Sequence, residues 1–134
     1  MRGEELFHDG LILRDLHRFK AAAKVFHEVR ILNPDFSEAW FWEAVSHDNS
    51  GNEMDAIPCY LEAIRLGVSD ELLPKTFLWL SSSYSRVGDC GQSEKYFKMA
   101  EENGNYQPKE EFELLSNKIR KRNERNEKLK KDEI

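Results

Sequence analysis

The chain has 134 residues, of which 40% are apolar and 34% charged, and its 20 basic and 25 acidic side chains give a net charge of −5. This length suits one domain, and this composition is typical of a globular, helix-rich chain. The negative charge disfavours a globally basic nucleic-acid binder. No apolar run approaches the roughly 18 residues of a membrane span, and the first residues lack the layout of a secretory signal. The two cysteines make no disulfide framework, so we expect a reducing, cytoplasmic location.

Two amphipathic helices are predicted at the start of the chain. Residues 4–15 and 19–32 each have apolar side chains three and four positions apart, and His17-Arg18 forms the turn between them. Asn33-Pro34-Asp35 ends the second helix. Ser37 follows at a position from which it can cap a third helix.

Glycine and proline mark the remaining helix boundaries. The breaks fall at Gly51-Asn52, Gly67, Gly88-Asp89 and Gly104-Asn105, with Pro74 and Pro108 in the first turns of two later helices. Pro58 is expected near the first turn of the fourth helix, where its missing N–H has little cost.

One arrangement of large and small residues occurs three times, with a period of roughly 34 residues. Large residues align at Phe26, Tyr60 and Phe97, and small residues align at Gly10, Ala44 and Ser81. The small residues are expected to let paired helices approach closely, while the aromatic residues fill the space opposite.

This arrangement resembles the tetratricopeptide repeat family. The residues that carry the resemblance are Gly10, Ala22, Phe26 and Pro34 in the first copy; Trp40, Ala44, Gly51, Ala56, Tyr60 and Ala63 in the second; and Phe77, Leu80, Tyr84, Gly88, Phe97 and Ala100 in the third. Residues 39–66 also resemble short bacterial proteins of this kind. The resemblance implies an all-α solenoid of three helix-turn-helix repeats within residues 1–107, at about 3–36, 37–73 and 74–107. In this register Trp40 and Phe77 belong to the core.

The chain departs from the family pattern at four positions. Glu43 stands where the pattern has leucine, His47 where it has tyrosine, and Ser93 where it has alanine. Val68 replaces the closing proline of the second copy, and extra residues follow it. These departures affect the angle between repeats more than the fold class.

Residues 108–134 are predicted to form a C-terminal capping helix. Phe112, Leu115 and Ile119 make one short apolar stripe, so the capping role is assigned to residues 109–122, and residues 123–134 are expected to fray. Residues 118–131 carry eight basic and two acidic side chains, a net charge of +6. This segment is interpreted as a solvated helix end, because no aromatic residue is interleaved for base stacking. An arm for nucleic acid or an anionic surface is the alternative.

The resemblance implies that the first helix of each pair lines a concave surface, which predicts a partner site. Its apolar centre comprises Phe7, Leu11, Phe41, Trp42, Val45, Leu78 and Trp79, and its rim comprises Glu38, Asp48, Lys75 and Arg86. An apolar centre with a polar rim is typical of protein–protein sites. The predicted function is a non-catalytic scaffold or adaptor that binds a peptide or helix of another protein. Self-association as a homodimer and simple packing of these side chains are the alternatives.

Neither an enzyme nor a metal or cofactor site is predicted. His8-Asp9 and His47-Asp48 occupy different positions in their repeats, and no set of residues has the spacing of metal ligands. Cys59 and Cys90 have no legible base or oxyanion donor nearby, and no phosphate-binding loop is present. A clamp for a terminal carboxylate, known in co-chaperone members of the family, is also not expected, because only Lys75 could serve as its donor.

Overall fold

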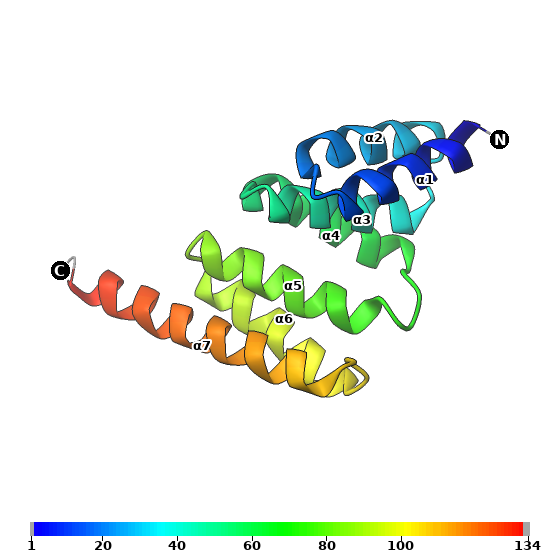
Figure 1. Ribbon diagram of the computed structural model, residues 1–134. Helices are drawn as coiled ribbons and strands as arrows, with labels where there is room; N and C mark the ends of the chain where they lie inside the picture. The colour runs from blue at the N-terminus through cyan, green and yellow to red at the C-terminus, as the bar shows by residue number, and fades with distance from the viewer. Residues whose placement is uncertain (1, 133–134) are drawn as a thin grey trace. The chain divides into compact units, whose positions relative to one another are not determined.

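The computed structural model describes residues 2–132, and within that range the chain forms seven α-helices and no strand. The helices are α1 (Arg2–Asp15), α2 (Phe19–Leu32), α3 (Ser37–Asn49), α4 (Glu53–Leu66), α5 (Leu73–Arg86), α6 (Cys90–Asn103) and α7 (Lys109–Asp132). They belong to two compact units, one ending at Val68 and the other beginning at Ser69 (Figure 1). The predicted all-α fold is confirmed.

The first unit holds four helices that pack in chain order, α1 on α2, α2 on α3 and α3 on α4. Phe26 and Tyr60 fill its core and have no exposed surface. Gly10 lies so close to Phe26 that an added Cβ atom would be 2.7 Å from the ring. The close approach expected at Gly10 is therefore present, and it depends on the missing side chain.

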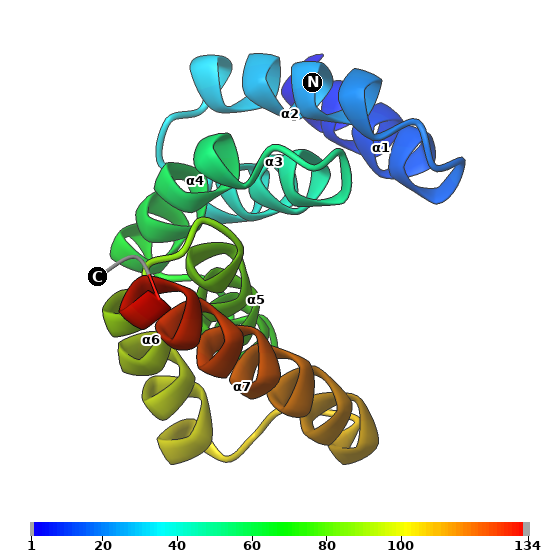
Figure 2. The ribbon, with the colours of Figure 1, turned by 90° about the vertical axis from the view of Figure 1, so that its left-hand side faces the viewer.

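The second unit pairs α5 with α6, and α7 packs mainly against α5 (Figure 2). Ser81 and Ser93 face each other across the pair, where the Ser81 hydroxyl donates to the Ser93 carbonyl at 2.7 Å. Ile119 of α7 is buried, as a capping helix requires. The helix continues to Asp132, however, so the expectation that it would fray beyond Arg122 is wrong for residues 123–132. Residues 133–134 lie outside the described part of the chain.

Two expectations about helix ends also need correction. Ser37 is the first residue of α3 rather than its cap; Phe36 precedes the helix, and no side chain caps it. Pro58 lies inside α4 rather than near its first turn. By contrast, Gly67 and Gly104 end α4 and α6 in the left-handed conformation, with φ of 90° and 69°.

None of the helices within residues 2–132 combines the length and the apolar character needed to cross a membrane.

Candidate functional site

In the first unit, the predicted partner residues divide into buried and partly exposed groups. Phe41 has no exposed surface and Val45 has 6%, so both belong to the core. Trp42 is only half-buried. Its ring lies edge-on to Phe41, with ring centroids 4.8 Å apart, and the Arg14 guanidinium of α1 lies 4.2 Å from its centroid. Trp42 is therefore held between a buried ring and a cation, a geometry that fixes its orientation.

The two predicted residues of α1 lie beside the core. Phe7 packs against Phe26 and Phe36, with centroid separations of 5.6 and 4.9 Å, and it keeps some exposed surface. Leu11 is also partly exposed. Both side chains offer apolar surface, although Phe7 also stabilises the contact between α1 and α2.

In the second unit, Leu78 is fully buried and Trp79 is half-buried. The Trp79 indole Nε1 donates to the Tyr106 hydroxyl at 3.1 Å, and that hydroxyl donates to Glu111 Oε1 at 2.6 Å. Burial raises the pKa of Tyr106, and its bond to Glu111 raises it further, so the phenol stays protonated. The Lys75 ammonium lies 5.8 Å from the Trp79 ring centroid. Sequence reasoning missed Tyr106 and Glu111, which come from the loop before α7 and from α7 itself.

The rim residues have individual roles within their own units. Asp48 accepts a hydrogen bond from the Tyr60 hydroxyl at 3.0 Å, so it also stabilises the pairing of α3 with α4. Glu38 and Lys75 are partly exposed and Arg86 is exposed. Because Phe41, Val45 and Leu78 are buried, the accessible members of the predicted apolar centre are Phe7, Leu11 and Trp42 in the first unit and Trp79 in the second.

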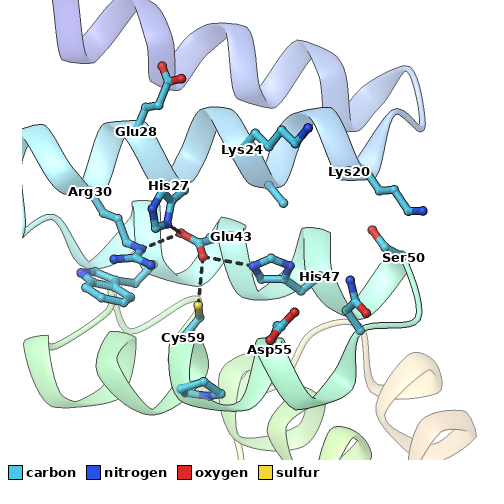
Figure 3. A pocket seen from close by; sticks show the side chains of 14 residues that line it. Lys20, Lys24, His27, Glu28, Arg30, Glu43, His47, Ser50, Asp55 and Cys59 are labelled. Atoms are coloured by element: carbon cyan, nitrogen blue, oxygen red, sulfur yellow. Dashed lines mark hydrogen bonds and ion pairs between the residues drawn. The ribbon is translucent and has the colours of Figure 1, made fainter.

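A second candidate site is a pocket of about 850 Å³ in the first unit, lined by residues of α2, α3 and α4 (Figure 3). Glu43 of α3 lies at its base and is only 3% exposed. The four side chains that surround this carboxylate are Arg30, His27, His47 and Cys59 (Figure 3). A buried carboxylate needs such partners, because burying an unpaired charge is costly.

The two oxygens of Glu43 have different partners. Oε1 accepts from Arg30 Nε at 2.6 Å and lies 3.5 Å from His27 Nδ1. Oε2 lies 3.1 Å from His47 Nε2 and accepts from the Cys59 thiol at 3.3 Å. Burial raises the pKa of Glu43, but the hydrogen bonds of His47 and Arg30 outweigh burial and lower the pKa to about 2. Burial and the neighbouring Glu43 charge raise the pKa of Cys59, so the carboxylate is ionised and the thiol protonated.

The structure corrects the expectation that no residues have the spacing of metal ligands. The ligand atoms of Glu43, His47 and Cys59 all lie within 4.8 Å of one another. Glu43 and His47 are two of the departures from the repeat pattern, and their spacing of four places them on one helix face. The spacing of Glu43 and His47 could therefore have indicated two neighbouring ligands from the sequence alone. The third member, Cys59, comes from α4, and only the folded structure brings it there.

Trp40 also differs from its predicted place in the core. It is only half-buried and lines the pocket, where the Arg30 guanidinium lies 3.9 Å from its ring centroid. Its indole Nε1 donates to the Pro34 carbonyl at 2.9 Å. Phe77, its counterpart in the next repeat, is buried as predicted. Trp40 stays near the surface because its indole nitrogen bonds to the Pro34 carbonyl there and its ring packs against the Arg30 guanidinium.

Comparison with solved structures identifies the fold of this chain. No family model matches the chain, and no curated protein matches it. The structure has the α-solenoid fold of tetratricopeptide-like helical proteins, as the repeats predicted.

Three similar solved structures illustrate this likeness. The type III secretion translocator chaperone SycD of Yersinia enterocolitica matches 96% of this chain and 93% of its own, with 22% identity and a TM-score of 0.72. PcrH, solved in complex with the chaperone binding region of PopB, matches 90% of this chain and 94% of its own, with 17% identity and a TM-score of 0.71. A mutant form of MamA matches 76% of this chain and 72% of its own, with 24% identity and a TM-score of 0.69.

Proposed function

We propose that this protein is a non-catalytic adaptor that binds an apolar peptide or helix of a partner protein through half-exposed aromatic side chains of α3 and α5. The observation that carries this proposal is the pair Trp42 and Trp79. They occupy the same position in successive repeats, both keep exposed surface, and each is oriented by a specific neighbour. Tryptophan is enriched among the few interface residues that dominate binding energy.

The comparisons support a peptide ligand. SycD has been solved with a peptide of the translocator YopD, and PcrH with the chaperone binding region of PopB. Both share the fold over most of this chain. In the proposal this chain likewise engages a segment of another protein, with Phe7 and Leu11 extending the apolar contact and Glu38, Asp48, Lys75 and Arg86 setting specificity at the edge.

The chemistry of the side chains restricts the partner segment. A terminal carboxylate needs several hydrogen-bond donors that converge on it. The positions that correspond to the family's carboxylate clamp are Phe7, Leu11, Trp42, Lys75 and Trp79, and Lys75 is the one lysine or arginine among them. An internal apolar segment therefore fits better than an acidic C-terminal tail. Two unpaired cysteines favour the cytoplasm as the place where this binding occurs.

The test is a selection of displayed peptides on the whole chain, followed by calorimetric titration of the best binder. Trp42→Ala and Trp79→Ala are each expected to weaken that peptide by roughly thirtyfold, since buried aromatic anchors contribute about 2 kcal/mol or more. Trp40→Ala is the matched control, because this tryptophan lines the separate pocket. It is expected to leave the affinity unchanged.

Helical circular dichroism and a thermal melt accompany each variant. Normal peptide affinity in folded Trp42→Ala and Trp79→Ala proteins would contradict the proposed site. An equal loss in the Trp40→Ala protein would show that the effect is not specific to these two side chains.

A further inference from the structure

Three potential metal ligands meet at the base of the pocket in the first unit, and the proposed peptide binding uses none of them. They are Glu43 Oε2, His47 Nε2 and Cys59 Sγ, all within 4.8 Å of one another (Figure 3). Glu43 Oε2 lies 3.1 Å from the imidazole nitrogen and 3.3 Å from the sulfur. In a tetrahedral zinc site with bonds of about 2.0–2.3 Å, neighbouring ligand atoms are about 3.3–3.6 Å apart. The two distances from Glu43 Oε2 are therefore close to those of a zinc site, and the third, between His47 Nε2 and Cys59 Sγ, is at most 4.8 Å.

We propose that Glu43, His47 and Cys59 form a Zn²⁺ site, with the fourth position occupied by water from the pocket. A thiolate, an imidazole and a carboxylate are all established zinc ligands, and a thiolate with an imidazole disfavours the hard cations Mg²⁺ and Ca²⁺. The pocket gives the ion a route to the cluster, because Glu43, His47 and Cys59 all contribute to its lining.

The carboxylate of Glu43 is arranged for coordination through one oxygen. Its Oε1 is occupied by Arg30 Nε at 2.6 Å, with His27 also on that side. Its Oε2 faces the histidine and the cysteine. Arg30 would thus orient the ligand from behind, as partners in the outer shell of metal sites commonly do.

Zinc binding to this cluster can be balanced in protons and in charge. Zn²⁺ replaces the proton of the Cys59 thiol, which passes to solvent as the Zn–S bond forms, and His47 binds as the neutral imidazole. The negative charges of the Glu43 carboxylate and the Cys59 thiolate then neutralise the ion. The positive charge of Arg30 is no longer balanced by Glu43. Asp55, which lines the same pocket, places a further carboxylate nearby.

The site would connect two helices of the first unit. Glu43 and His47 belong to α3, whereas Cys59 belongs to α4. A metal bound only in the folded state stabilises that state by mass action. Zinc binding is therefore expected to raise the melting temperature of the protein.

The experiment titrates the whole, reduced chain with Co²⁺ as a spectroscopic probe and with Zn²⁺ in competition against a chromophoric chelator. We expect one equivalent of Co²⁺ to give a sulfur-to-cobalt charge-transfer band with visible bands of tetrahedral intensity. Cys59→Ser is expected to abolish the charge-transfer band, and both Cys59→Ser and His47→Gln are expected to weaken Zn²⁺ at least tenfold. Cys90→Ser is the matched control, because Cys90 is the buried, unpaired cysteine of the other unit.

Several outcomes would overturn the zinc site. They are no stoichiometric metal binding by the wild-type chain, wild-type affinity in folded Cys59→Ser and His47→Gln proteins, or a charge-transfer band that disappears in the Cys90→Ser protein instead. A Zn²⁺-induced rise in melting temperature that persists in the Cys59→Ser protein would contradict it as well. Circular dichroism of each metal-free variant establishes that a loss of binding is not a loss of fold.

Discussion

Glu43 shows how one polar residue is accommodated in the core of a helical repeat. Its carboxylate is buried at a position where the repeat pattern has leucine, yet both oxygens have partners. Replacing a buried ion pair by apolar residues is often neutral, whereas removing one partner leaves the other charge buried alone. Glu43 and Arg30 therefore depend on each other.

Glu43→Gln is expected to lower the free energy of unfolding by about 3 kcal/mol, because it leaves the Arg30 guanidinium without its counter-ion. Glu62→Gln is the matched control. Glu62 pairs with Arg65 on the surface of α4, where solvent screens the pair and its contribution to stability is small. Urea denaturation in the presence of EDTA measures both effects. Equal effects of the two substitutions would show that the Glu43 network contributes no more to stability than a surface ion pair does.

The buried Glu43 carboxylate is also expected to make the stability of the protein sensitive to acid. The pKa of its carboxyl is about 2 in the folded protein, below the ordinary value of 4.5. A lowered folded-state pKa contributes stability that is fully present above pH 4.5 and is lost as the pH falls toward 2. With EDTA present, the wild-type protein should therefore lose more stability across this pH range than the Glu43→Gln protein. Parallel pH profiles of unfolding free energy would contradict this assignment.

At the scale of elements, the contact between α1 and α2 is limited by side-chain volume. Gly10→Ala would place a Cβ atom 2.7–3.0 Å from three carbons of the buried Phe26 ring. We expect a loss of about 1–3 kcal/mol, since overpacking shifts side chains from their preferred positions. Gly91→Ala in the first turn of α6 is the control, because the nearest atom to its Cβ would be 3.8 Å away. It should stabilise the protein by about 0.5–1 kcal/mol.

Those opposite signs are measured as opposite shifts of the denaturation midpoint. A Gly10→Ala protein as stable as wild type would mean that α1 moves away from α2 without cost.

The C-terminal half of α7 is part of the fold rather than a tail. The Asn123 side chain is buried and donates to Ser93 Oγ at 3.0 Å, and Asn126 donates to the Ser85 carbonyl at 2.9 Å. These bonds fix α7 to α5 and α6 at positions with no apolar stripe. Lys130 adds a bond to the Gly88 carbonyl at 3.1 Å.

Asn123→Ala is expected to cost about 1–2 kcal/mol, because it removes a buried hydrogen bond and leaves space at the helix contact. Asn117→Ala, on the exposed side of α7, should change stability by less than about 0.5 kcal/mol. Thermal denaturation of the two variants gives the comparison. A stable Asn123→Ala protein would restore the expectation of a frayed end.

At the scale of the whole molecule, the distribution of charge favours peptide binding over nucleic-acid binding. Residues 118–131 carry a net charge of +6, while the complete chain carries −5, so the rest of the chain is strongly acidic. The acidic remainder repels a polyanion, and two side chains of the basic segment, Arg122 and Lys130, already contact α5 or the turn after it.

The protein is therefore expected to elute from immobilised heparin at or below physiological salt, where surface charges are substantially screened. Elution well above that salt concentration, lost when the eight basic side chains of residues 118–131 are replaced by glutamine, would favour the nucleic-acid or anionic-surface alternative. Folding of the substituted chain is checked by circular dichroism.

The repeated spacing of large and small residues determined the helical class, the helix pairs and the close contact at Gly10. Such periodicity records which side of each helix is buried, and helix-breaking residues mark the ends, so both are local properties of the sequence. The length of α7 was missed because polar side chains, rather than an apolar stripe, fix its second half.

Tertiary structure alone decided which members of the predicted partner site remain accessible. Phe41 and Trp42 are neighbours in sequence, yet one is buried and the other partly exposed, because burial depends on what packs against each side chain. It also brought Cys59 of α4 to Glu43 and His47 of α3. Helical spacing predicts neighbours on one helix, but ligands from two helices meet only through the packing of those helices.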